Sequence, residues 1–130
     1  MKVIRLNKGE HLIEALTEKL KGQSGGSVIG IGALSEVSLM LYNLKDKSYS
    51  KKTIKGSLEV CSFTAVVAKL PNSKIGLHAH IVVSGDDFIC YGGHLEEAVV
   101  AATFEAVFTK SDQLLKREFS KEIGLNLLKD

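Results

Sequence analysis

The stretch IGLHAHIVV, residues 75–83, carries an apolar residue at every odd-numbered position. His78 and His80 stand at even-numbered positions between them. Successive side chains of a β-strand point to opposite faces of a sheet. The pattern therefore predicts a strand whose odd-numbered residues face a core, with both histidines projecting together from the other face.

Similar strand patterns recur along most of the chain. Segments rich in β-branched and aromatic residues are separated by the turn-like stretches KDKS (45–48), PNSK (71–74) and SGDD (84–87). The expected strands are residues 2–6, 27–34, 36–44, 57–70, 74–84, 87–93 and 101–109. Because the connections are short, an antiparallel or mixed sheet of about six to seven strands is favoured over a βαβ repeat.

One principal helix is predicted near the N-terminus, flanking the sheet. Leu12, Leu16 and Leu20 recur at helical spacing, and Asn7 with Glu10 resembles a capping box. The fold class is therefore α+β, in a single domain of residues 1–130. Its core is expected at about 3–119, with a C-terminal tail at 120–130. The charged, weakly periodic stretch 110–130 could form a short helix or cross to a neighbouring subunit.

Composition limits the class of protein. The chain has 130 residues, 45% of them hydrophobic, which suits one compact domain with one core. Its apolar stretches fall far short of the roughly 20 residues that a membrane span needs. The N-terminal segment MKVIRLNKGE lacks the apolar core of a signal peptide. We therefore expect a cytoplasmic protein without a membrane partner.

Cysteines and glycines offer no further motif. Cys61 and Cys90 lie without a CxxC or CxxH neighbour, so we expect buried, reduced thiols. Gly30 and Gly32 form G-x-G, but Ser35 replaces the third glycine of a dinucleotide-binding fingerprint. These two glycines indicate a bulge or a close backbone approach within a strand.

Charge gives only a mild preference for polyanions. The formal net charge is +2, and only two of the 17 basic residues are arginines, the side chain best suited to reading guanine. Five lysines gather between residues 45 and 55, and they are weak candidates for nucleic-acid contact: Lys45, Lys47, Lys51, Lys52 and Lys55. A solvated hairpin whose charges protect a sheet edge is the favoured alternative.

His94 is the third histidine within 17 residues. We expect Gly92-Gly93 to end a strand and to allow a sharp reversal that brings His94 beside His78 and His80. Three imidazoles so placed predict an open metal site, and imidazole suits zinc, copper, iron and nickel alike. Histidines that bind no ligand are the alternative.

Two glutamates stand at alternating positions in other expected strands. Glu59 and Glu105 could orient an imidazole of the histidine group or act as a base there. They are the candidate catalytic residues of the chain.

Several stretches, in order, resemble the plants-and-prokaryotes-conserved (PPC) domain: GEHLIEAL, IGIGALSEVSLMLYN, GSLEVCSFTA, LHAHIVVS, YGGHL and TFEAVF. The resemblance covers about residues 3–119 and implies an α+β domain that assembles as a homotrimer. It also implies that His78, His80 and His94 bind a divalent metal, with zinc favoured, near Glu59 and Glu105. The chain lacks the Arg-Gly-Arg core of the AT-hooks that precede the domain in plants.

Three functions follow from these patterns. The first is a homotrimeric regulatory module, associated with DNA directly or through a DNA-binding partner, with a three-histidine metal site. The alternative is a zinc-type hydrolase or lyase that uses the same histidines, with a glutamate relaying protons. A weaker third possibility is a metal-free anion site made by protonated histidines and backbone N–H groups near Gly92-Gly93.

Overall fold

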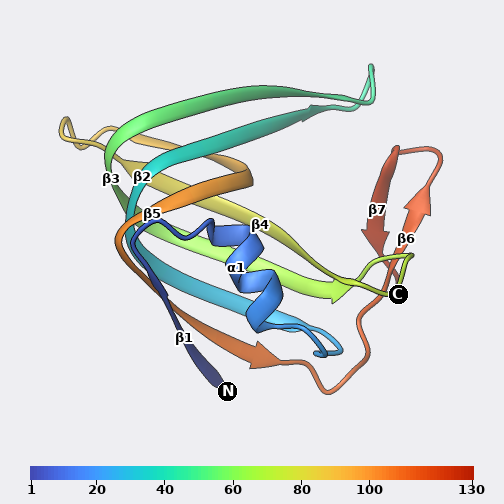
Figure 1. Cartoon of the computed structure of the whole chain (residues 1–130). Coiled ribbons are helices and arrows are strands. Elements are labelled where there is room, and N and C mark those ends of the chain that lie inside the picture. The colour runs from blue at the N-terminus through green and yellow to red at the C-terminus, as the bar shows by residue number, and fades with distance from the viewer.

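The computed structural model describes all 130 residues, as seven strands and one short helix (Figure 1). In chain order these are β1 (Lys2–Asn7), α1 (Leu12–Lys19), β2 (Gly26–Asn43), β3 (Ser48–Lys69), β4 (Ile75–Ser84), β5 (Cys90–Lys110), β6 (Arg117–Ser120) and β7 (Leu125–Leu128). The predicted fold class, a mainly antiparallel sheet with one flanking helix, is confirmed.

The main sheet has the order β1-β5-β2-β3-β4, and every neighbouring pair of strands is antiparallel. β5 pairs with β2 along most of its length, and its first residues also pair with β4. The four long strands therefore close into a ring, with β1 added to the free edge of β5. The sequence pattern predicted the strands but not this closure.

The strands are longer than their apolar segments suggested. The sequence predicts two strands here, at residues 27–34 and 36–44. The structure has one continuous strand, β2, which ends at Asn43, and its register with β3 shifts between Leu34 and Glu36. The lysine-rich residues 48–56 extend β3 because they pair with the far half of β2. This two-stranded arm extends beyond the rest of the sheet in Figure 1.

The core lies between the helix and the inner face of the curved sheet. Ala79, Ile81 and Val83 of β4 are buried as the alternation predicts, and Phe63 packs edge-to-face on Phe104 at a centroid distance of 5.2 Å. Leu12, Leu16 and Leu20 from the helix region are also fully buried. The helix thus covers the apolar inner face, where burial of each large side chain contributes about 1.5–3 kcal/mol.

The G-x-G pair has the structural role that the sequence suggested. A Cβ at Gly30 would lie 2.5 Å from the Phe104 ring, and one at Gly32 would lie 2.3 Å from the carbonyl oxygen of Thr103. The β2–β3 register also shifts between the two glycines. They allow a close approach of β5 and a bulge, as predicted.

The prediction of buried thiols is wrong. Cys61 and Cys90 are both free and exposed. Cys61 is the extra residue of a bulge in β3, where the register with β4 shifts between Val60 and Ser62. Cys90 begins β5 at the exposed β4–β5 turn.

The C-terminal tail forms no helix. Residues 117–128 make the antiparallel hairpin β6–β7, a separate two-stranded sheet (Figure 1) whose turn contacts the β2–β3 arm through Tyr42 and Lys47. Gly124 lies in the turn with a φ of +83°, a left-handed conformation that glycine adopts without strain. Its N–H donates to the carbonyl oxygen of Ser120 at 2.7 Å. Local turn chemistry therefore overrides the weak helical pattern.

The helix begins later than the capping box predicted. Glu10 does accept a hydrogen bond from the Asn7 N–H at 2.6 Å, but α1 starts at Leu12, after an N-cap residue whose side chain makes no capping bond. Instead, the Glu97 carboxylate accepts the N–H groups of Ile13 at 2.7 Å and Glu14 at 3.2 Å. The helix has eight residues, and it is neither long nor apolar enough to span a membrane.

We expect Glu97→Ala to lower the free energy of unfolding by about 1–2 kcal/mol, because two N–H groups at the start of α1 lose an ionised acceptor. Glu97→Gln should fall between this variant and wild type. Glu96→Ala is the matched control, since Glu96 makes only an exposed ion pair with Lys51, which contributes about 0–1 kcal/mol. Urea unfolding measures all three, and equal losses in the two alanine variants would contradict the capping role.

Candidate metal centre

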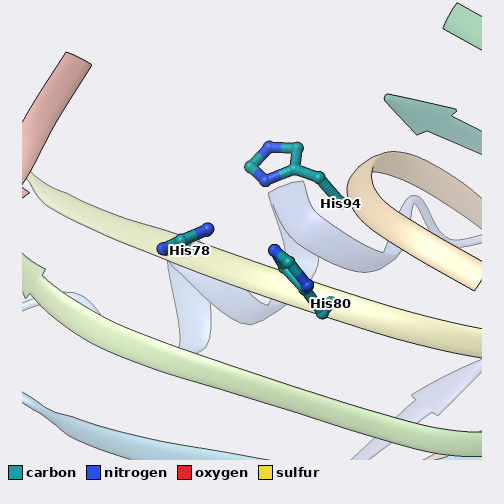
Figure 2. Close-up of side chains that lie close together, drawn as sticks. All are labelled: His78, His80 and His94. Atoms are coloured by element: carbon teal, nitrogen blue, oxygen red, sulfur yellow. The ribbon is translucent and has the colours of Figure 1, made fainter. Parts of the chain in front are cut away.

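His78 and His80 project from the outward face of β4 (Figure 2). Both residues are exposed, whereas Ala79 between them is buried. Across the β3–β4 ladder, His80 stands opposite Thr64 and His78 opposite Val66. The alternation in the sequence therefore placed these two imidazoles on the correct face.

His94 joins them from the neighbouring strand β5, although not by the route predicted. Gly92 and Gly93 do not end a strand or reverse the chain, because both lie inside β5 and pair with β4. The antiparallel register places His94 directly opposite His80. Gly92 is needed for close packing, since a Cβ there would lie 2.8 Å from the carbonyl oxygen of Ile81.

The three imidazoles form one compact group. Their ring centroids are 5.2 Å apart for His78–His80 and His78–His94, and 5.6 Å apart for His80–His94. One nitrogen from each ring lies within 4.8 Å of the others. A tetrahedral centre with Zn–N bonds of about 2.1 Å holds its ligands about 3.4 Å apart, so small side-chain rotations would suffice to fit the ion.

The surroundings favour uncharged imidazoles. Desolvation by burial lowers the pKa of His78 below its usual 6.5, and the nearby charges of Arg117, His94 and His80 lower it further. Burial also lowers the pKa of His94, with a smaller effect from His80. Because a metal ion binds neutral imidazole, both shifts favour the form of these side chains that could bind one.

A small cavity of about 240 Å³ opens beside His78 and His94. Tyr49 of β3 lines it and lies 5.7 Å from the His94 ring, between centroids. Arg117, the first residue of β6, also lines this cavity. Sequence reasoning missed Arg117, and the only signal was that it is one of two arginines in a lysine-rich chain.

The two candidate catalytic glutamates are not brought into the histidine group. Glu59 is exposed on β3, opposite Ser84 of β4. Glu105 of β5 stands opposite Arg5 of β1 in the β1–β5 ladder. Both residues line a different, larger depression of about 700 Å³ on the outer face of the sheet. Within one chain, the group that could hold a metal ion is therefore three imidazoles without a carboxylate.

The five lysines likewise do not form one patch. Lys51 pairs with Glu96, and the Lys52 ammonium lies over the Tyr91 ring, 5.4 Å from its centroid. The Lys47 ammonium donates to the carbonyl oxygen of Lys121 at 2.8 Å. Lys51 and Lys52 are consecutive strand residues, so they point to opposite faces. These contacts agree better with a solvated hairpin than with one basic surface.

Residues 1–112 match the sequence profile of the Plants and Prokaryotes Conserved domain, abbreviated PCC or PPC. No curated protein matches the chain.

Solved structures agree over nearly the whole chain. A protein from Bacteroides thetaiotaomicron, described provisionally as DNA-binding, is 29% identical with a TM-score of 0.93, over 98% of this chain and 90% of its own. A metal-containing protein from Archaeoglobus fulgidus is 31% identical with a TM-score of 0.89, over 99% and 92%. A plant- and prokaryote-conserved protein from Pyrococcus horikoshii is 25% identical with a TM-score of 0.90, over 99% and 90%.

Proposed function

Because the chain belongs to the Plants and Prokaryotes Conserved domain family, we propose that it is a homotrimeric, DNA-associated regulatory module that binds a divalent metal ion. His78, His80 and His94 would hold the ion, and zinc is the metal we expect. The metal-containing relative from Archaeoglobus fulgidus, at 31% identity, supports a metal in this fold.

The observation that carries the metal site is the convergence of three imidazole nitrogens within 4.8 Å from two paired strands. Three neutral imidazoles are a common ligand set for zinc, and they leave a fourth coordination position open. The β-ladder fixes two of the ligands opposite each other, so little ordering is needed on binding.

A binding role is favoured over catalysis by the absence of a base at the histidines. A bound zinc ion could polarise water or a carbonyl group, but efficient hydrolysis or lyase chemistry also needs a proton acceptor within reach. Neither Glu59 nor Glu105 belongs to the histidine group or lines the cavity beside it. The zinc-dependent enzyme therefore remains the second candidate.

Assembly is supported by an uncovered apolar surface. Val3, Ile29 and Ile31 are 78%, 60% and 60% exposed, and they line the 700 Å³ depression on the outer face of the sheet. Exposed apolar side chains gathered around a depression are typical of protein interfaces. The number three comes from the family resemblance.

DNA association has weaker support in the chain itself. One relative, at 29% identity, carries a provisional DNA-binding description. Of the five lysines, Lys45 and Lys55 have no partner within the chain, so they are the best placed to contact phosphate. Such contacts would be independent of sequence and sensitive to salt.

We expect protein purified without a histidine tag to contain one zinc ion per chain. His80→Ala should lose it, because only two of the three imidazoles would remain, and His80 is the one opposite His94 in the β4–β5 ladder. His11→Ala is the matched control, since His11 is the fourth histidine of the chain and lies at the start of α1. Elemental analysis of the three proteins measures the content. Unchanged metal in His80→Ala would contradict the assignment.

Acidification separates this site from a metal-free anion site. Zinc affinity should fall as the pH drops below 6.5, through the lowered pKa values of His78 and His94, since protonated imidazole cannot bind the ion. An anion held by protonated histidines would bind more tightly over the same range.

Light scattering should give a mass about three times the 14.1 kDa of one chain. Ile31→Glu should dissociate the assembly, because it places a charge in the apolar depression. Leu44→Glu changes an equally exposed leucine at the tip of the β2–β3 arm and should leave the mass unchanged. A wild-type protein that is monomeric at micromolar concentration would overturn the trimer.

Duplex DNA should be retarded by micromolar protein at about 150 mM salt, and binding should weaken steeply as salt rises. Lys45→Gln combined with Lys55→Gln should weaken it at every sequence tested. The control is Lys74→Gln with Lys129→Gln, which removes the same charge elsewhere. If wild-type protein retards no duplex, the DNA part of the proposal fails and the metal module stands.

A further inference from the structure

Arg117 is a half-buried cation without an acidic partner. One guanidinium nitrogen donates to the carbonyl oxygen of Asn126 at 3.2 Å, across the β6–β7 hairpin. No carboxylate lies within 4.0 Å of the group. Arginine presents five N–H donors in a planar fork that suits carboxylates, so most of this binding capacity is unused.

The cavity that Arg117 lines has a mixed lining: five of its ten residues are hydrophobic, and Arg117 is its one cation beside two histidines and Asn126. It contains His78 and His94, several leucines including Leu77 and Leu125, and no acidic residue. With a divalent ion on the three neutral imidazoles, two further positive charges would stand beside the guanidinium. A site with this charge and no anionic ligand of its own attracts an anion strongly.

We propose that this cavity binds a small organic carboxylate with an apolar body, and that Arg117 is the residue that recognises it. This inference rests on the proposed metal site, whose open fourth position would add to the attraction. The carboxylate would pair with the guanidinium fork, and the hydrocarbon part would contact Leu77 and Leu125. The volume of about 240 Å³ lies below the ~300–1,000 Å³ of sites for drug-sized ligands, which limits the class to small acids.

The position of Arg117 also makes the C-terminal hairpin part of the site. β6 and β7 supply Arg117 and Leu125, while β4 and β5 supply the histidines. Backbone hydrogen bonds attach the chain just before the hairpin to the rest of the fold, since the N–H of Lys69 donates to the carbonyl oxygen of Leu115 at 2.8 Å and the N–H of Leu115 donates to the carbonyl oxygen of Ser24 at 3.0 Å. The hairpin therefore brings a cation to the cavity that the histidines of β4 and β5 also line.

Calorimetric titration of zinc-loaded protein with acetate, propionate and butyrate tests the proposal. Binding should strengthen about fourfold with each added methylene, as apolar surface is buried. Butyramide, which has nearly the same shape without the charge, should bind at least tenfold more weakly than butyrate. Equal binding of butyrate and butyramide would overturn the role of charge in recognition.

Arg117→Gln should reduce butyrate affinity at least tenfold while the protein keeps its full zinc content. Its zinc affinity should exceed that of wild type, because a positive charge next to the ion is gone. Collapse of the hairpin would give no such gain, so an unchanged or lower zinc affinity would count against the recognition role of Arg117. Lys116→Gln removes the same charge at the adjacent position, outside this cavity, and should change neither affinity.

The two proposals fail in different ways. Protein that takes up no zinc overturns the proposed function, and butyrate titrated into it still tests Arg117 against Arg117→Gln. The carboxylate site alone is overturned if zinc-loaded protein does not bind butyrate at millimolar concentration. It is also overturned if Arg117→Gln binds butyrate as tightly as wild type does.

Discussion

The double pairing of β5 is the constraint on which the rest of the structure depends. Its first residues pair with β4, and from His94 onward it pairs with β2. His94 takes part in both ladders, opposite His80 on one side and Met40 on the other. The histidine group therefore lies where the sheet closes. Three residues further on, Glu97 of the same strand accepts the first N–H groups of α1, so closure of the sheet also positions the helix.

The sequence predicted what local alternation controls. The two faces of β4 follow from a period-two pattern, which correctly predicted that His78 and His80 lie on the face away from the core. Closure could not be predicted in this way, because it depends on register between strands far apart in the chain. The Gly92-Gly93 pair shows the difference. Glycine permits both a reversal and a close strand contact, and only the partner strand decides between them.

Residues that act across long sequence separations were also missed. Glu97 caps a helix more than eighty residues away, and nothing in its own neighbourhood distinguishes it from Glu96. The stretch 110–130, which contains Arg117, has weak helical periodicity, and a four-residue turn ending at Gly124 is enough to make residues 117–128 a hairpin. The buried-thiol prediction failed for a related reason, since the bulge at Cys61 comes from the pairing with β4 and not from the composition of β3.

The histidine group and the apolar depression are neighbours on the outer surface. Thr64 lines the depression and stands directly opposite His80 in the β3–β4 ladder. Neighbouring strands are about 4.8 Å apart, so a subunit that covered the depression would reach within roughly one strand spacing of His80. If the assembled protein binds the metal ion more tightly than the free chain does, then metal binding stabilises the assembly by mass action. Metal binding and assembly would then be linked, because a subunit at the depression would shield the imidazoles from water. The cavity beside Arg117 opens next to His78 and His94, and it shares no lining residue with the depression.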